Sequence, residues 1–255
     1  MLTRAQLQTI FPKASAADID AFIRTGEQAL RDSGILQGLN RLQYFLAQLG
    51  HESRGLTNLE EGLNYSASRL MEVWPSRFPT IEIARQYERN PEKLANFVYG
   101  GRLGNTQSGD GYRYRGRGYI QLTGRETYRE VGRIAGLDLE ANPDLAANPD
   151  NAVRIACAYW TWKGLNAACD AGDFTRLTRN INGGTNGLSD RLDWLGKVQA
   201  IVKAIGSSVS DATQPTPARP PQGVPTPRPK PPQTEAGETD STLANNAVLE
   251  AQKKL

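Results

Sequence analysis

The sequence predicts a mainly α-helical folded body over residues 1–205, with at most a small β element, followed by a disordered proline-rich tail. Three observations support this prediction. Apolar residues recur at helical spacing through most of the body, side chains suited to capping precede these segments, and alternating strand patterns are scarce. The helical class therefore rests on pattern as well as on composition.

The starts and ends of the helices can be placed by their polar residues. Thr3 and Ser15 each precede a polar residue by three positions, the spacing of a capping pair, so helices are expected to begin there. The second of these helices is expected to end near the Ser-Gly pair at 33–34. Asn-Pro-Asp at 148–150 begins another helix. The clearest alternating pattern covers 119–123 and favours a short strand.

The composition changes abruptly near residue 206. Nine of the 15 prolines fall between 215 and 232, among polar residues and without an aromatic side chain. Such a segment buries too little apolar surface to offset its ordering entropy, so residues 206–240 are predicted to form a disordered linker. Residues 241–255 carry weak helical periodicity and are predicted to be a short helix or a docking tail.

The bulk composition limits the classes of site. The net charge of +3 is too small to indicate a particular anionic partner. With two cysteines and one histidine, neither a disulfide framework nor a metal site is predicted, and no cofactor is expected. The first residues lack a basic start followed by an apolar run, and no stretch is long enough to span a membrane. We therefore expect a monomer that is made in the cytoplasm.

Glu52 lies at the end of a predicted apolar helix face. Leu42, Phe45, Leu49 and Glu52 share one side of the helix, so the carboxyl group continues an apolar stripe. Partial removal from water favours the protonated form of a carboxyl group, which a general acid requires. The alternative is that the stripe ends and Glu52 faces water.

A second carboxylate follows at Glu60 or Glu61. On one continuous helix, Glu52 and Glu61 would lie about 13 Å apart on opposite faces. The Ser-Arg-Gly sequence at 53–55 predicts a helix stop, so the chain can fold back and bring the two groups across a cleft. Two carboxylates flanking a glycosidic bond are the usual means of its hydrolysis. Spacing alone does not choose between Glu60 and Glu61, and both could be solvated surface residues.

Two further segments are rich in glycine. Residues 99–124 interleave glycine with tyrosine and arginine, a composition that suits stacking on sugars, binding of RNA, or a turn-rich connection with a structural role. Residues 180–187 read as an amide-rich turn. His51 is interpreted as a hydrogen-bonding neighbour of Glu52. Cys157 and Cys169 are interpreted as small buried residues, with a bridge between them left open.

The order of these segments resembles that of the family 19 glycoside hydrolases, the chitinase-like enzymes, and especially their compact bacterial and phage endolysin branch. The matching motifs are GHES at 50–53, EGLNYS at 61–66, YRGRGYIQLTG at 114–124 and INGG at 181–184. The resemblance covers about residues 1–200 and implies a lysozyme-like domain of two lobes with an inverting mechanism. In plant chitinases an acidic residue lies near the position of Asn186 and the cleft loops are longer, which favours the endolysin branch.

The resemblance also implies roles for individual residues. Glu52 falls at the position of the general acid, Glu61 at that of the general base, and Thr123 at that of the hydroxyl residue that helps hold the attacking water. Arg191 matches a basic residue that supports the acid. The positions expected to bind substrate or to support the cleft are Asn64, Tyr65, Gln121, Asn182 and Arg191.

The sequence therefore predicts an endo-acting hydrolase of peptidoglycan β-1,4 bonds, similar to an endolysin or muramidase, that acts on the cell wall after release or export. A chitinase is the first alternative and a non-catalytic glycan-binding protein the second. A nucleic-acid binder is disfavoured, because acidic groups in a cleft repel phosphates.

Overall fold

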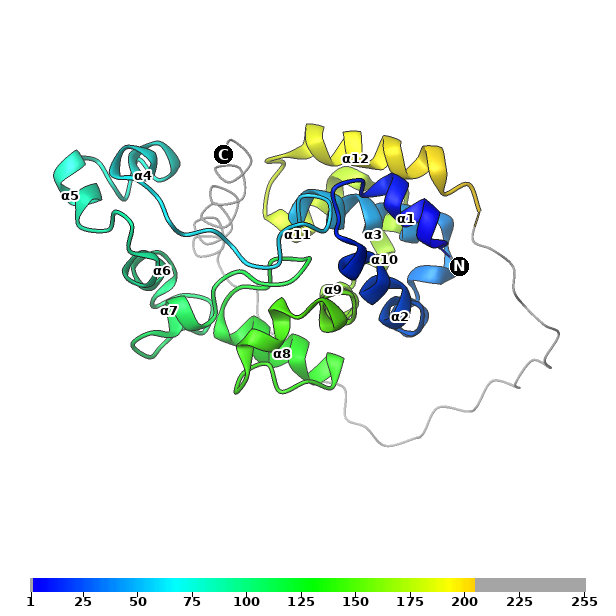
Figure 1. The fold of residues 1–255 in the computed structure, drawn as a ribbon, viewed down its shortest axis with the longest axis horizontal. Helices are drawn as coiled ribbons and strands as arrows, with labels where there is room; N and C mark the ends of the chain where they lie inside the picture. The colour runs from blue at the N-terminus through cyan, green and yellow to red at the C-terminus, as the bar shows by residue number, and fades with distance from the viewer. Residues whose placement is uncertain (1, 205–255) are drawn as a thin grey trace.

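The computed structural model describes residues 2–204, in which helices are the main secondary structure (Figure 1). The predicted linker at 206–240 and tail at 241–255 lie outside the described residues. The helices, with the two 3-10 helices η1 and η2, are α1 (Arg4–Ile10), α2 (Ala16–Asp32), η1 (Ile35–Gln37), α3 (Leu39–Glu52), α4 (Ala67–Val73), α5 (Ile81–Arg85), α6 (Pro91–Tyr99), α7 (Asp110–Arg113), α8 (Arg125–Ala135), η2 (Pro143–Ala147), α9 (Pro149–Trp162), α10 (Asn166–Asp170), α11 (Phe174–Asn182) and α12 (Leu188–Ile201).

The capping residues lie where the sequence predicts them. Thr3 forms a capping box with Gln6 at the start of α1, and the Ser15 side chain accepts a hydrogen bond from the Asp18 amide in the first turn of α2. Asn148 caps α9, whose first residue is a proline. Gly34 follows α2 with a φ of 70°, a left-handed conformation that glycine adopts without strain. The predicted boundaries of these helices are therefore confirmed.

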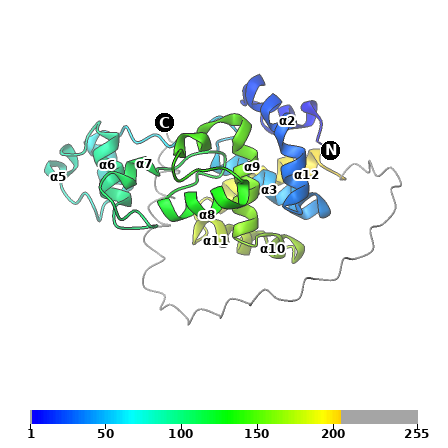
Figure 2. The ribbon, with the colours of Figure 1, turned by 90° about the horizontal axis from the view of Figure 1, so that it is seen from below.

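The helices pack around two separate hydrophobic cores. Helices α4–α7 form a small lobe, and its buried residues include Leu70, Trp74 and Phe78. Helices α1–α3 and α8–α12 form a large lobe around Phe45 and Trp160. The small lobe lies at one end of the molecule in both views of the ribbon (Figures 1 and 2). The predicted mainly α domain of two lobes is confirmed.

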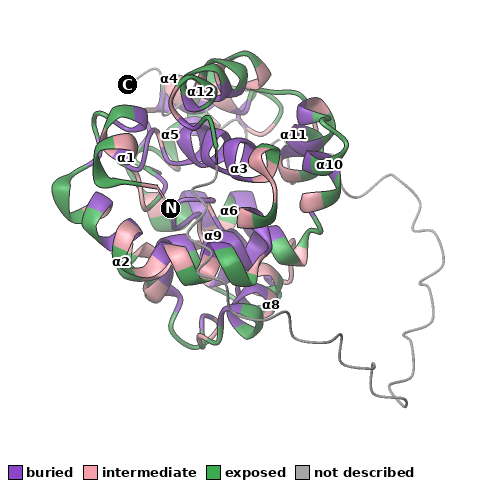
Figure 3. Cartoon of the chain, turned by 90° about the vertical axis from the view of Figure 1, so that its right-hand side faces the viewer, coloured by how far each residue is buried: buried purple, intermediate pink, exposed green. Residues whose placement is uncertain are grey.

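Helix α3 lies in the middle of the large lobe and is buried on all sides (Figure 3). Every residue from Leu42 to Glu52 is buried, a wider burial than the predicted apolar stripe. Helix α12 approaches α3 closely at Gly50. A Cβ added there would lie 2.5 Å from the Trp194 ring, so only glycine fits at this crossing.

The predicted strand at 119–123 is wrong. The described residues contain isolated β-bridges only, from Glu60 to Arg117 and from Arg117 to Leu122. Gly118 and Gln121 both have positive φ, so the chain turns where a strand would stay extended. The turn is closed by paired backbone hydrogen bonds between Arg117 and Leu122. This small β element joins the two stretches of chain that connect the lobes.

Cys157 and Cys169 are buried free thiols, as the interpretation of small buried residues requires. Burial raises the pKa of each thiol to about 12. In the part of the chain that the structure describes, no helix is long and apolar enough to cross a bilayer. The same residues contain no grouping of three or more His, Cys, Asp or Glu side chains that could hold a metal ion.

Candidate active site

The predicted helix stop after Glu52 is present. Helix α3 ends at Glu52, and Arg54 and Leu56 both have positive φ. The Ser53 hydroxyl donates to the Leu49 carbonyl at 2.6 Å and accepts the Leu56 amide at 2.8 Å. These bonds fix a tight reversal, so the chain leaves α3 and carries Glu61 away from the helix axis.

Glu52 is held by a buried arginine from α12. Arg191 Nη2 lies 2.6 Å from Glu52 Oε1, and the two side chains are 0% and 9% exposed. Arg191 Nη1 donates to the Gln48 amide oxygen, and Gln48 Nε2 donates to Thr178 Oγ1 at 3.1 Å. Gln48 lies one helical turn before Glu52 on the same face. The last turn of α3 is therefore tied to both α11 and α12.

His51 makes a second connection to α12. Its Nδ1 lies 2.6 Å from Asp190 Oδ2, and the histidine side chain is 1% exposed. Asp190 directly precedes Arg191, so α3 and α12 are joined by two neighbouring polar pairs. This agrees with the interpretation of His51 as a hydrogen-bonding neighbour of Glu52, and it fixes the helix end that carries the carboxyl group.

Glu61 is held in the chain that links the lobes. Its amide donates to the Gly116 carbonyl at 2.9 Å, and the Gly116 amide donates back to Oε1 at 2.5 Å. The hydroxyl of Tyr99, a small-lobe core residue, donates to Oε2 at 2.8 Å. Each carboxylate oxygen thus has a fixed donor, and the group is oriented by both the small lobe and the 116–118 backbone.

The pKa of the Glu61 carboxyl lies above its ordinary value. Burial is the main cause, and it outweighs the opposing effects of the Gly116 amide, the Tyr99 hydroxyl and the nearby charges of Arg115 and Arg117. Burial and the neighbouring Glu61 also raise the pKa of Tyr99 well above its usual range, so its hydroxyl stays a donor. A carboxylate with a raised pKa is a stronger proton acceptor when it is ionised.

Glu60 has a different environment. Its side chain is 42% exposed, forms an ion pair with Arg115, and lies 3.5 Å from Arg117 Nε. Glu61 is only 7% exposed. Glu60 is thus exposed and engaged by arginine side chains, whereas Glu61 is buried and oriented by two neutral donors. The geometry therefore favours Glu61 over Glu60 as the second carboxylate of the pair, a choice that sequence spacing alone left open.

The turn at 116–123 brings further predicted residues to Glu61. Gly116 lies close to the side chains of Gln121 and Glu61. A Cβ added at Gly116 would be 3.1 Å from Gln121 Oε1 and 3.3 Å from Glu61 Cδ. The Thr123 hydroxyl donates to the Gln121 carbonyl at 3.0 Å, which leaves its oxygen lone pairs available to another donor. Glu61, Gln121 and Thr123 therefore belong to one small structural unit.

Glu61 and Asn64 line one pocket. This hollow has a volume of about 290 Å³, and Tyr112 and Arg115 lie on its wall. Asn64 is exposed. Tyr65, in contrast, is 3% exposed and packs edge-to-face on Trp74 with ring centroids 5.5 Å apart. Asn64 has the accessibility that its predicted contact with substrate needs, whereas Tyr65 lies in the core of the small lobe.

Asn182 and Arg191 are also buried, at 3% and 0% exposure. Asn182 Nδ2 donates to the carbonyl of Asn186 at 3.0 Å, so this amide shapes the loop between α11 and α12. Arg191 contacts Glu52, as the resemblance to a residue that supports the acid implies. Direct contact of either side chain with substrate stays a prediction.

Most of the Tyr/Arg/Gly segment has a structural role. Tyr114, Arg117 and Tyr119 are at most 2% exposed. Arg117 lies 2.9 Å from Asp144, and Tyr119 donates to Asp18 at 3.1 Å. Buried rings of this kind cannot stack on bases, which removes the main argument for RNA binding. Among the tyrosines and arginines from 112 to 119, only Tyr112, Arg113 and Arg115 keep accessible side chains.

Three residues that hold Glu61 or the neighbours of Glu52 were not predicted from the sequence. Tyr99 donates to Glu61, Gln48 accepts from Arg191, and Asp190 pairs with His51. Gln48 could have been found, because it lies four positions before Glu52 on the same helical face. Asp190 adjoins the predicted Arg191, but no pattern pairs it with His51. Tyr99 lies 38 residues after Glu61, and nothing in the sequence connects the two.

Comparison with known proteins assigns the chain to a protein family. A relative from Haemophilus influenzae, described as a glycosyl hydrolase family 19 domain-containing protein, is 39% identical over 193 residues, which are 75% of this chain and 92% of that protein. The chain belongs to glycoside hydrolase family 19. The family model described as chitinase class I matches residues 80–178, a range that includes Thr123 and lies after both glutamates.

Other relatives of this family 19 enzyme are plant proteins. Endochitinase 2 of Gossypium hirsutum is 32% identical over 149 residues, and the match covers 58% of this chain and 41% of that protein. Among solved structures, chitinase C from Streptomyces griseus is similar to 79% of this chain and 92% of its own, at 20% identity and a TM-score of 0.48. The family 19 protein is thus a glycoside hydrolase, and its substrate is a polysaccharide.

Proposed function

We propose that this enzyme hydrolyses the β-1,4 bonds of peptidoglycan from within the chain, with inversion, as an endolysin does. The observation that carries the proposal is the pair of buried, oriented carboxyl groups, Glu52 at the end of α3 and Glu61 between the lobes. Each has its own fixed partners, Arg191 for Glu52, and Tyr99 with Gly116 for Glu61. Burial, orientation and distinct surroundings are what separate an acid from a base in glycoside hydrolysis.

In this mechanism Glu52 protonates the leaving glycosidic oxygen. Glu61, in its ionised form, takes a proton from a water molecule that attacks the opposite face of the sugar. An inverting mechanism needs about 6.5–9.5 Å between the carboxyl groups to hold that water. The raised pKa of Glu61 supports the role of base. Thr123, whose hydroxyl proton is directed to the Gln121 carbonyl, accepts a hydrogen bond from the same water.

The substrate-binding roles follow from the same placement. Asn64 borders the pocket of Glu61, and Gln121 lies against the backbone of Gly116 beside it. We assign both to the sugar next to the scissile bond. Arg191, which is buried, supports Glu52 from behind.

Peptidoglycan is favoured over chitin by the span of the relatives. The match to the Haemophilus influenzae protein, a bacterial relative, covers 92% of that protein, whereas the chain spans about two fifths of the cotton endochitinase that it matches.

Chitin hydrolysis is the second candidate, favoured by the chitinase family model and by the endochitinase relatives. Both polymers consist of β-1,4-linked N-acetylated sugars, so the same pair of carboxyl groups serves either one. A glycan-binding protein without activity is the third candidate, and it predicts binding of the polymer without products.

Product analysis distinguishes these candidates. Purified peptidoglycan and chitin hexamer are digested in parallel by the wild type and by Glu52→Gln, which keeps the shape of the side chain but removes its proton. We expect muropeptides from peptidoglycan, new reducing ends that are α-anomers by NMR, and no products from the variant. Products from chitin alone would support the second candidate. Binding without products would support the third, and β-anomers would exclude inversion.

A further inference from the structure

A second hollow adjoins the pocket of Glu61. It has a volume of about 600 Å³ and lies between the 112–117 segment and the 141–148 segment. Tyr112 and Arg115 line both hollows, so the second one continues the first. The Arg115 guanidinium stacks 4.1 Å above the Tyr112 ring, which forms an amphipathic wall between them. A polymer bound at Glu61 can therefore extend into this region.

The charges of this hollow do not cancel. Its lining includes Arg113, Arg115 and Arg117 but a single carboxylate, Asp144. Asp144 lies 2.9 Å from Arg117, and Glu60 pairs with both Arg115 and Arg117. The two carboxylates therefore balance two of the three arginines. Arg113 is left as the cation without an acidic partner among residues 2–204.

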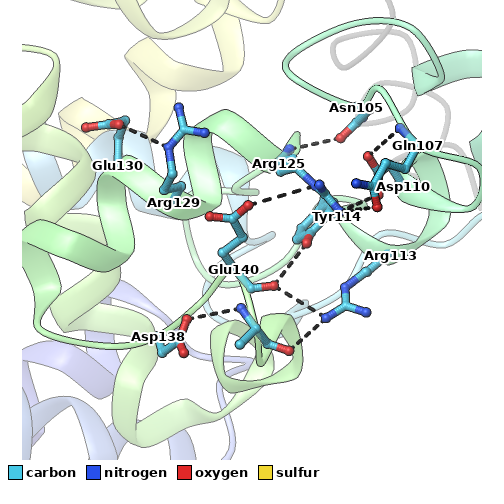
Figure 4. Close-up of polar contacts among 11 residues, drawn as sticks. Asn105, Gln107, Asp110, Arg113, Tyr114, Arg125, Arg129, Glu130, Asp138 and Glu140 are labelled. Atoms are coloured by element: carbon cyan, nitrogen blue, oxygen red, sulfur yellow. Dashed lines mark hydrogen bonds and ion pairs between the residues drawn. The ribbon is translucent and has the colours of Figure 1, made fainter.

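Arg113 is nevertheless held in place. Its Nη2 donates to the carbonyl of Ala141 at 2.8 Å and, more weakly, to that of Glu140 at 3.5 Å (Figure 4). The loop that supplies these carbonyls is fixed by Asp138, which accepts the Ala141 amide at 3.1 Å, and the Glu140 carboxylate lies toward Arg125. Neutral carbonyls orient the guanidinium without neutralising it, and within residues 2–204 its Nη1 and Nε make no hydrogen bond.

We propose that Arg113, with Arg115 at its edge, binds a carboxylate carried by the muramic acid units of the substrate. This inference rests on the proposed peptidoglycan function. The carboxylate belongs to the peptide stem or, on muramic acid units without a stem, to the lactyl group, whose carboxyl is otherwise consumed in the amide bond to the stem; chitin carries neither. A guanidinium with two free donors on an oriented side chain fits a carboxylate in a charge-assisted pair. The hollow thus selects for the acidic glycan next to the cutting site.

The test compares variants of the full chain on three substrates. These are native peptidoglycan, peptidoglycan whose carboxylates have been converted to amides with carbodiimide and ammonia, and strands from which an amidase has removed the stems. Arg113→Gln removes the cation. Arg129→Gln is the matched control, because Arg129 is 52% exposed on α8 and, within residues 2–204, forms an ion pair only with its neighbour Glu130.

For Arg113→Gln we expect the apparent KM on native peptidoglycan to rise about five- to tenfold, with kcat within about twofold. On amidated peptidoglycan, which carries no carboxylate for Arg113 to bind, the same variant should raise the apparent KM by less than about twofold. Arg129→Gln should match the wild type on both substrates. Removal of the stems also frees the lactyl carboxylates. If the stripped strands lose the difference between wild type and Arg113→Gln, the ligand is on the stem. If they keep it, the arginine also binds a freed lactyl carboxylate.

Equal losses for Arg113→Gln on native and amidated substrate would overturn the inference, as would no loss on either. In both cases the wild type still cleaves peptidoglycan, so the proposed function stands. If the wild type releases nothing from peptidoglycan but cleaves chitin, the proposed function fails and the inference fails with it. Thermal melting of each variant checks that a change in KM does not arise from unfolding.

Discussion

Removal of the Arg191 guanidinium is expected to destabilise the large lobe strongly. Arg191→Met keeps most of the apolar stem but takes the cation away from Glu52, whose side chain is 9% exposed. The carboxyl group would then lie buried without its charged partner, and the amide oxygen of Gln48 would lose a donor as well. The loss of one partner from a buried ion pair costs about 3–5 kcal/mol, because the remaining charge is uncompensated.

An exposed ion pair should contribute much less to stability than the buried pair of Glu52 and Arg191. The side chains of Arg24 and Asp150 form an ion pair at 59% and 51% exposure, and such a pair contributes about 0–1 kcal/mol. For a folded body of this size, 1 kcal/mol shifts the melting temperature by about 2–4 °C. Arg191→Met should therefore lower it by about 10 °C, and Arg24→Met by no more than about 3 °C. Replacement of arginine by methionine should therefore lower the melting temperature strongly in the buried ion pair and only slightly in the exposed one.

Calorimetry of the full chain at neutral pH measures both shifts. The double variant Glu52→Gln/Arg191→Met adds a further check, because a neutral amide needs no cation. It should be more stable than Arg191→Met alone. A fall of less than 3 °C for Arg191→Met would refute the reasoning. So would a double variant whose loss equals the sum of the two single losses, since Glu52 and Arg191 would then act independently.

Three further predictions concern the base and the packing behind the acid. Glu61→Gln should lose nearly all turnover while Glu60→Gln keeps most of it, as initial rates on peptidoglycan would show; the reverse order would move the base to Glu60. Tyr99→Phe removes a donor that favours ionised Glu61, so the pKa of that carboxyl should rise further and the acidic limb of the kcat/KM profile should move to higher pH. An unchanged limb would mean that another group sets it. Gly50→Ala places a Cβ 2.5 Å from the Trp194 ring and should cost about 1–3 kcal/mol in a urea titration, and a neutral result would show that α12 can shift.

Local features of the fold could be predicted from the sequence. The caps at Thr3 and Ser15 and the stop at 53–55 depend on contacts within a few residues, so their signals lie in short stretches of chain. The placement of Glu52 at a buried helix end follows from the same local periodicity. The choice of Glu61 as the base followed from resemblance to a family, and the structure favours it on independent grounds of burial and hydrogen bonding.

Other features depend on residues that are distant in sequence. The pattern at 119–123 alternates like a strand, but no second strand lies beside it to complete a ladder, so it turns back on Arg117. Helix α3 carries polar residues outside the apolar stripe of Leu42, Phe45 and Leu49. The pattern therefore predicts that these polar residues are exposed. Gln43 is instead buried, because its amide donates to the Val202 carbonyl 159 residues away. Sequence periodicity does not report such a distant partner.

The two hydrophobic cores have a consequence for protein engineering. Glu52 is anchored in the large lobe by α12, whereas Glu61 takes one of its donors from Tyr99 in the core of the small lobe. The chain passes between the lobes at 53–66, after α3, and again at 114–124, between α7 and α8. The small lobe could be exchanged for that of a relative at these two crossings. Each such chimera would change the surroundings of Glu61 and leave those of Glu52 unchanged. Such chimeras could be sorted by the pH of half-maximal activity, with the acid as a constant internal reference.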